Sequence, residues 1–361
     1  MPSSGYIMSS ILPQECFKNV IEFVKEEPNS NIYSCVLVNR QWMRECLPLL
    51  WSQPFNDIPT SSNGVKLINT YISCLSTNKK RYLSDNSIYL RQNSTPEIDY
   101  LAYLKELNYE IFEEYTRFWL LENNYSNQAS SAADLNVIIE SLDSADIEYN
   151  NNQLKILLSC LFSMFIEKSI SLTHIIFCSD YKLCLDLPEL PAWISSSNAI
   201  MGASYAAPNN SDSLKRLTTF VCEINDSDLR LPNLMIFMGF LSARCKMLST
   251  IVFTWKSQYD INIYNYLIIE IIKEQRQLKE IILDINNFNI EGVIDTLINT
   301  QQHNLVVLHL ENADLSNNSQ VVISYFCIFH KLKVLKLINS CEHVKAIRTY
   351  EMITEYRHPV I

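Results

Sequence analysis

The hexapeptide LKEIIL at Leu278–Leu283 belongs to a pattern that recurs along the second half of the chain. The pattern is a leucine, two residues, an apolar residue, one residue and a second apolar residue. Its six copies begin at Leu172, Leu217, Leu248, Leu278, Leu305 and Leu332. Successive copies are separated by 45, 31, 30, 27 and 27 positions, so the spacing settles toward a regular period. Apolar residues two positions apart predict a strand with one buried face in each copy.

Helical patterns lie between the copies. Apolar residues of Ile290–Ile298 follow at i, i+3, i+4, i+7 and i+8, which is one face of a helix, and Asn262–Gln277 and Asn318–Phe329 are similar. Each strand–helix unit has an apolar side that it cannot bury alone. We therefore expect neighbouring units to stack.

A short strand followed by a helix, at a period near 27 residues, resembles a leucine-rich repeat. The resemblance implies an irregular solenoid with a parallel sheet. The fit is partial, because the family places Asn or Cys three residues after the last apolar position of the strand. Asn225 and Asn286 stand there, whereas Ala313 and Ser340 do not match. The alternative is an ordinary α/β domain with a parallel sheet.

A second organising stretch is Ile11–Trp51. It opens with Leu12-Pro13-Gln14-Glu15, continues with apolar residues at helical spacing, carries Val38-Asn39-Arg40-Gln41-Trp42, and closes with Leu49-Leu50-Trp51. Proline suits the first turn of a helix, because its missing N–H would have no partner there. The stretch predicts three short helices. About forty residues form a thin core, so part of this apolar surface is expected to need a partner.

These four features, in this order, resemble an F-box, a three-helix module that docks a protein onto the Skp-type adaptor of a cullin ubiquitin ligase. The resemblance implies an F-box domain over residues 8–53, although Cys16 and Phe17 stand where the family usually has two aliphatic residues. The alternative is an ordinary helical start to a larger domain. The resemblance assigns to the adaptor interface Leu12, Pro13, Phe17, Val20, Ile21, Val38, Trp42 and Trp51. Some of these must form the core of the module itself.

Residues 54–150 are expected to form a helical connector with loops, and residues 151–361 the domain that resembles leucine-rich repeats. Leu67, Tyr71 and Leu75 fall four apart and predict a short helix. The polar stretch Asn78–Ser94 is predicted to be irregular, and Asp99–Glu122 to be a longer helix. The fold class expected for the whole chain is therefore an F-box of three helices, a helical connector and an irregular repeat solenoid.

Composition limits the classes of function. The formal charge of -10 argues against a protein that binds nucleic acid by neutralising phosphates. The most apolar segment, Leu154–Ile170, is interrupted by charge and is too short to span a bilayer. Met1–Gly5 lacks the basic residue of a secretory signal, and the eleven cysteines show no disulfide spacing. The sequence predicts a soluble protein of the cytoplasm, the nucleus or both, with no membrane partner.

Motifs for bond chemistry are lacking from the sequence. The five glycines are far apart, whereas phosphate-binding loops need them clustered. The six histidines show no metal-ligand spacing. Asp226-Ser227-Asp228 is interpreted as a turn and not as a cation site. We therefore expect no catalytic residue, no cofactor and no metal ion, although a site assembled from scattered residues of the repeat domain remains an alternative.

An F-box followed by leucine-rich repeats resembles the substrate-recognition subunits of SCF-type E3 ubiquitin ligases. The resemblance implies a non-catalytic receptor whose F-box binds a Skp-type adaptor, and through it a cullin, while the repeats hold a target protein for ubiquitination. Its contribution to the rate would be proximity. One alternative is an F-box protein that acts outside ubiquitination, and another is an enzyme.

Alternation within the strands predicts where the target binds. Ile281 and Leu283 should point into the stack, and the residues between and beside them onto the exposed sheet face. The residues predicted on that face are Glu280, Ile282, Asp284, Val307, His309, Glu311, Val334, Lys336 and Ile338. Ile282, Val307 and Ile338 are the candidate anchors. The alternative is that the C-terminal segment Glu342–Ile361 covers this face.

Overall fold

The structure is a computed structural model. It describes residues 19–21, 23, 24, 32–56, 61–90, 96–125, 144–179, 187, 214–224, 231–256, 261–285, 290–312, 326 and 328–338. The helices are α2 (Ile32–Val36), α3 (Arg40–Leu50), α4 (Ser61–Ser73), α5 (Thr77–Asp85), α6 (Tyr109–Tyr125), α8 (Ser144–Lys168), α10 (Pro232–Arg244), α11 (Ile261–Glu274) and α12 (Ile290–Gln301), with 3-10 turns η1 (Tyr100–Tyr103) and η3 (Leu214–Arg216). The strands are β1 (Glu106–Asn108), β2 (His174–Ser179), β3 (Thr219–Ile224), β4 (Thr250–Trp255), β5 (Glu280–Ile285), β6 (Val307–Glu311) and β7 (Val334–Ile338).

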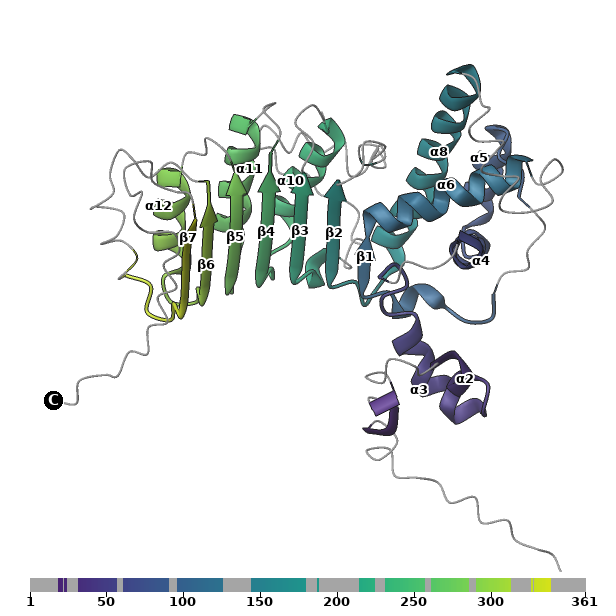
Figure 1. The fold of residues 1–361 in the computed structure, drawn as a ribbon, viewed down its shortest axis with the longest axis horizontal. Coiled ribbons are helices and arrows are strands. Elements are labelled where there is room, and N and C mark those ends of the chain that lie inside the picture. The colour runs from purple at the N-terminus through teal and green to yellow at the C-terminus, as the bar shows by residue number, and fades with distance from the viewer. Residues whose placement is uncertain are drawn as a thin grey trace, which may run out of the picture.

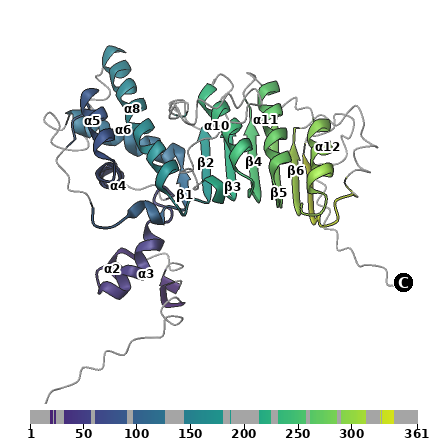
Figure 2. The same cartoon turned by 180° about the vertical axis from the view of Figure 1, so that it is seen from behind.

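The described strands form one parallel sheet in which every strand lies beside its neighbour in sequence, in the order β1-β2-β3-β4-β5-β6-β7. The six copies of the leucine pattern fall on β2 to β7, so the predicted parallel strands are confirmed. Equivalent pattern positions pair across the sheet, as Ile251 with Ile281 and Ile281 with Leu308. The helices α10, α11 and α12 lie on one side of this sheet (Figures 1 and 2). The fold is thus a mixture of helices with a sequential parallel sheet.

Strand β1 extends the same pattern and was missed by the sequence analysis. Its hexapeptide LKELNY, Leu104–Tyr109, has leucine at the first and fourth positions and Tyr109 at the sixth. Leu107 pairs with Ile175 of β2, and the ring of Tyr109 stacks on Phe177 with the centroids 5.2 Å apart. The predicted helix over Asp99–Glu122 is therefore wrong at its start, because α6 begins only at Tyr109.

A repeated backbone contact fixes the strand starts. The carbonyl of Lys279 accepts hydrogen bonds from the N–H groups of Val306 and Val307, at 2.7 and 2.9 Å. The same forked contact is made by the carbonyls of Lys105, Thr173, Thr218, Ser249 and Val306. Ser52 repeats it at the edge of the sheet, because its carbonyl accepts from Lys105 and Glu106 at 2.9 and 3.0 Å. The segment after α3 therefore continues the stack beyond β1.

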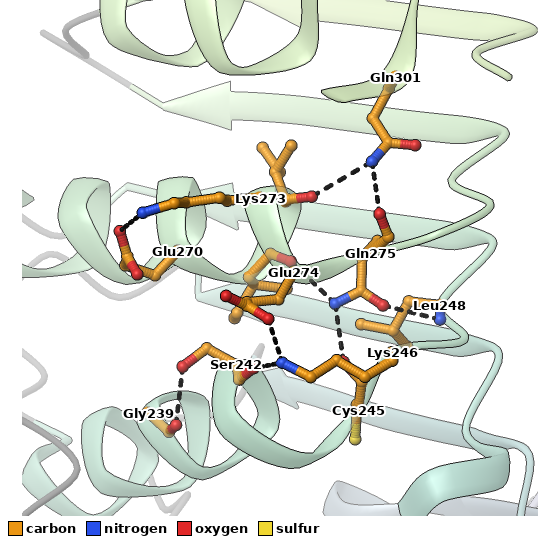
Figure 3. Close-up of polar contacts among 12 residues, drawn as sticks. Gly239, Ser242, Cys245, Lys246, Leu248, Glu270, Lys273, Glu274, Gln275 and Gln301 are labelled. Atoms are coloured by element: carbon orange, nitrogen blue, oxygen red, sulfur yellow. Dashed lines mark hydrogen bonds and ion pairs between the residues drawn. The ribbon is translucent and has the colours of Figure 1, made fainter. Parts of the chain in front are cut away.

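Buried amide side chains join successive helices behind the sheet (Figure 3). Gln275 accepts from the Leu248 N–H at 2.9 Å and donates to the carbonyls of Cys245 and Ile271 at 2.9 and 2.8 Å. Gln301 donates in turn to the carbonyl of Gln275 at 2.7 Å. Both glutamines are almost fully buried, and such groups must be hydrogen-bonded to be tolerated. These contacts satisfy the backbone where each helix turns into the next strand.

The region before the sheet differs in part from the expectation. The predicted helix around Leu67 and Tyr71 is confirmed as α4. The expected irregular stretch Asn78–Ser94 is wrong, because α5 occupies Thr77–Asp85. Ser76 caps that helix by accepting from the Lys79 N–H, and Leu83 anchors it in the core. The expected boundary at residue 150 falls inside α8, and strand β1 before it already belongs to the sheet.

Two separate hydrophobic cores are present among the described residues. The large core runs from Phe55 through α4, α6, α8 and the inner face of the sheet to Leu335. The small core consists of Ile21 and Cys46 with partly buried Ile32, Cys35, Val36, Trp42 and Leu49. We call the part of the chain around this small core, which is residues 19–24 as far as they are described and 32–51, the N-terminal helical unit. It projects from the β1 end of the sheet (Figure 1).

No described helix combines the length and the apolar composition needed to cross a bilayer. The apolar segment Leu154–Ile170 lies mostly in α8, whose side chains from Leu161 to Ile166 are buried in the large core. Its apolar character is therefore explained by packing within the protein. The Asn225, Asn286, Ala313 and Ser340 positions lie outside the described residues.

Candidate interaction surface

The face of the sheet opposite the helices carries three rows of side chains, because residues two apart in a strand point the same way. We call this the open face. The first row is His174, Thr219, Thr250, Glu280, Val307 and Val334. The middle row is Ile176, Val221, Val252, Ile282, His309 and Lys336. The third row is Cys178, Glu223, Thr254, Asp284, Glu311 and Ile338. All eighteen side chains are half-buried, whereas the described positions that alternate with them are buried, except the partly buried Leu337.

Four β-branched side chains make the middle row apolar from β2 to β5. Ile176 pairs with Val221, Val221 with Val252, and Val252 with Ile282. At the β6 side the row continues with His309, and at the β1 side it ends at Asn108. The result is a narrow apolar strip across four strands, edged by polar side chains at both ends.

Carboxylates gather in the third row, two residues further along the strands. Glu223 accepts from the Cys178 thiol at 3.6 Å. Asp284 accepts from the side-chain amide of Asn312 at 2.7 Å and lies 4.0 Å from the ammonium of Lys256. Glu311 lies further along, on β6. The third row is therefore acidic, although one of its carboxylates has a nearby counter-charge.

His309 continues the middle row on β6, next to Glu311 of the acidic row. Its Nε2 lies 3.8 Å from a carboxylate oxygen of Glu311. Burial lowers the pKa of the His309 imidazole below its ordinary value, and this outweighs the opposing effect of Glu311. The imidazole is consequently neutral at neutral pH, so its contact with Glu311 is not an ion pair there. The acidic character of the row is retained.

The predicted strand register is confirmed by burial and pairing. Ile281 and Leu283 are buried, whereas Glu280, Ile282 and Asp284 lie on the open face. The other six residues predicted there, on β6 and β7, also lie on it. The candidate anchors Ile282, Val307 and Ile338 are in three different rows and do not form a continuous strip. The segment Glu342–Ile361, which was the alternative cover of this face, lies outside the described residues.

The sequence analysis missed the apolar strip itself. Ile176, Val221 and Val252 hold the fifth position of the first three copies of the pattern, the position that Ile282 holds in the fourth. Reading that position through all copies would have found them. Their arrangement as one row also depends on which residues pair between strands. The sequence did not give that pairing, because the first two copies are separated by 45 residues.

The residues assigned to the adaptor interface fall into three groups. Leu12, Pro13 and Phe17 lie outside the described residues. Ile21 and Trp42 belong to the small core, while Val20 and Val38 are 40 % and 61 % exposed. Trp51 contacts Tyr100 and Tyr71, with ring centroids 4.1 and 5.6 Å apart. Its indole therefore joins the N-terminal helical unit to the large core.

Among the described side chains, burial raises the pKa of several cysteine thiols, of which Cys74 is only partly buried, and of the Tyr71 and Tyr100 hydroxyls. Burial raises the pKa of Cys46 and of Cys160 to about 11, and that of Cys245 to about 12. These thiols are protonated at neutral pH, and the Cys245 thiol donates to the Leu214 carbonyl at 3.0 Å. In the described part of the chain, His, Cys, Asp and Glu side chains form no group of three that could hold a metal ion. Asp226 and Asp228 lie outside that part.

In the described part of the chain, the open face and the N-terminal helical unit are thus two surfaces with a distinctive composition. One combines an apolar strip with an acidic row, and the other exposes apolar side chains around a small core. Comparison of this chain with protein-family models, curated proteins and solved structures found no match.

Proposed function

We propose that this chain is the substrate-recognition subunit of an SCF-type E3 ubiquitin ligase. In this proposal the N-terminal helical unit is an F-box that docks onto a Skp-type adaptor. The sheet domain is an irregular leucine-rich-repeat solenoid whose open face holds a target protein. The chain performs no bond chemistry and raises the rate by bringing the target close to the charged ubiquitin-conjugating enzyme.

The observation that carries the proposal is the exposed apolar surface of the N-terminal helical unit. Its large exposed hydrophobic residues are Val20 at 40 %, Phe23 at 64 %, Tyr33 at 56 %, Leu37 at 68 % and Val38 at 61 % exposure. They are five of the eleven such residues in the described part of the chain, although the unit is a small fraction of it. Large apolar side chains exposed in this number on one small unit indicate a surface that a partner buries.

The position of the unit also supports docking. Its described contacts with the rest of the chain include those of Trp51 at the end of α3, and the next residue, Ser52, accepts from the start of β1 through its carbonyl. Leu37 and Val38 lie at the other end of that helix, just before its Asn39 cap. An adaptor could therefore cover these side chains without displacing the sheet domain, whose open face remains available for a target.

The repeat assignment is supported by strand order and contact pattern. Every described strand neighbours the next one in sequence, and the forked backbone contact recurs at each strand start. A doubly wound α/β sheet would instead reverse its strand order at a switch point. Stacked strand–helix units reproduce this order directly, because each unit contacts only its neighbours.

The test is adaptor binding by the full-length chain. The double variant Leu37→Asp/Val38→Asp places two charges on the exposed surface and should abolish capture of a purified Skp-type adaptor. The matched control is Ile263→Asp/Tyr266→Asp on α11, which changes two residues of 47 % and 56 % exposure far from the unit. Both variants should melt near the wild-type temperature. Equal adaptor binding by the two variants would refute the docking assignment.

A second arm separates the proposal from an F-box protein that acts outside ubiquitination. When cullin is added to the complex of wild-type chain and adaptor, the proposal requires a ternary complex that elutes as one species in gel filtration. An adaptor complex that excludes cullin would favour the alternative. Because both arms use the intact chain, neither depends on the N-terminal helical unit folding by itself.

A further inference from the structure

The geometry of the open face limits which shape of partner can use it. Adjacent strands are about 4.8 Å apart, so the four apolar side chains from Ile176 to Ile282 span roughly 14 Å. A partner that contacts all of them must present one apolar side chain about every 4.8 Å along a line across the strands. The strip is one side chain wide, so the partner needs an equally narrow apolar stripe.

An α-helix meets this requirement better than an extended chain. Its apolar stripe repeats once per turn, about every 5.4 Å, so a helix lying along the row departs from the strand spacing by only about 2 Å over the three intervals of the strip. Same-face side chains of an extended segment repeat about every 6.6 Å, which departs much further from the spacing. A helix also satisfies its own backbone groups, whereas an extended segment lying on the face, away from a sheet edge, would leave them unpaired.

The charges beside the strip define one flank of that helix. The third row runs parallel to the strip at about 6.6 Å, two residues along the strands. It carries Glu223, Asp284 and Glu311, while the ammonium of Lys256 lies 4.0 Å from Asp284. With Glu280 in the first row, the eighteen residues of the open face include four carboxylates and one ammonium group, that of Lys336, and the ammonium of Lys256 lies beside them. Charge complementarity then favours basic side chains on the flank above the third row.

We propose that the open face binds an amphipathic helix of a partner protein, with one apolar side chain per turn seated over β2 to β5 and lysine or arginine along the flank that faces Glu223, Asp284 and Glu311. The inference rests on the proposed function, because it names the chemistry of the target that the sheet domain would hold. In this inference the apolar strip provides the affinity for the partner helix, and the acidic row determines the orientation of the bound helix.

The experiment uses a displayed library of helical peptides of about 18 residues, long enough for the strip with a turn to spare at each end. The peptides are randomised on one face and selected against the immobilised full-length chain. The selected peptides should carry apolar residues once per turn and lysine or arginine on one flank. Selection of acid-flanked or non-helical sequences, or of none, would overturn the inference.

Variants test the two parts of the surface separately. Glu223→Gln/Glu311→Gln should weaken binding of a selected peptide about tenfold at low salt, and much less at high salt. The matched control, Glu291→Gln/Asp295→Asn, removes two exposed carboxylates from α12 and should change binding by less than about twofold. Ile282→Asp should abolish binding. Equal effects of the two carboxylate pairs would overturn the assignment of the acidic row.

A shortened chain that lacks residues 342–361 identifies the competing occupant. Peptide binding that appears only after this deletion would mean that the chain covers its own face, and would overturn binding of a partner helix. Adaptor capture is measured on the same preparations. A chain that binds the peptide but does not capture the adaptor would refute the proposed function alone. A chain that captures the adaptor but does not bind the peptide would refute the helix-binding inference alone.

Discussion

Ile281 and Ile282 are adjacent isoleucines in one strand and provide a matched test of the open face. Ile281 is fully buried behind the sheet, whereas Ile282 is half-buried on the open face. Replacing either by alanine removes the same three carbon groups and causes the same loss of strand propensity. The difference between the two variants therefore reports only where each side chain points.

The expected costs follow from burial. Three buried carbon groups are worth about 2.4 kcal/mol of transfer free energy, and the cavity left in the core brings Ile281→Ala to about 3–4 kcal/mol. Ile282→Ala loses about half of the transfer free energy and leaves no closed cavity, so it should cost about 1 kcal/mol. At about 2–4 °C per kcal/mol for a domain of this size, the melting temperatures should fall by roughly 6–16 °C and 2–4 °C.

The assay is thermal unfolding of the full-length chain followed by circular dichroism, together with binding of a selected helical peptide at a temperature where both variants are folded. Ile282→Ala should weaken peptide binding and Ile281→Ala should leave it nearly unchanged. The reasoning is refuted if the two variants lose equal stability, or if the more stable variant is the one that retains peptide binding.

Further predictions concern the amide contacts, the small core and the titrating histidine. Gln275→Leu leaves the buried Leu248 N–H and Cys245 carbonyl unpaired and should cost about 2–5 kcal/mol in urea unfolding, whereas Gln277→Leu, at a half-exposed position, should cost under about 0.5 kcal/mol. Trp42→Ala should remove about 2–3 kcal/mol and weaken adaptor binding, because the indole packs on the small core but is only partly buried. The pKa of His309 is lowered in the fold, so the unfolded chain binds the proton more readily as the pH falls below the ordinary histidine value. Stability should decrease with acidification from that point, and the decrease should be smaller in His309→Gln, as measured by melting temperatures across that pH range.

The parallel sheet was predictable because its pattern is local and repeated. Alternating apolar residues in each copy specify which side of the strand is buried, and shifting a strand by one residue would expose all of them. The same alternation placed Glu280, Ile282 and Asp284 correctly on the open face. What a single copy could not give was the row across strands, since that depends on the register between segments far apart in the chain.

The missed strand shows where local pattern becomes ambiguous. LKELNY at Leu104–Tyr109 differs little from LKEIIL at Leu278–Leu283, yet its leucines three apart also suit a helix, and a helix does follow at once. The contact that decides between them is pairing of Leu107 with Ile175, 68 residues later and after α6 and α8. The stretch Asn78–Ser94 failed for a related reason. α5 has a weak apolar pattern, and it is held by the Ser76 cap and by the burial of Leu83 in a core built from distant segments.

In the N-terminal stretch, tertiary contact also distinguishes the residues that pack in a core from those available to the proposed adaptor, which the sequence alone did not. Ile21 and Trp42 lie in the small core, Trp51 contacts the large core, and Val38 lies on the surface. All four are large apolar residues, and three short helices give no periodicity long enough to distinguish a buried face from a docking face. Burial of Ile21 and Trp42 in the small core stabilises the unit. Substitutions at these two residues should therefore weaken adaptor binding only as the unit unfolds. A substitution at Val38 should weaken it with the unit folded, which is how stability and recognition can be measured apart in this chain.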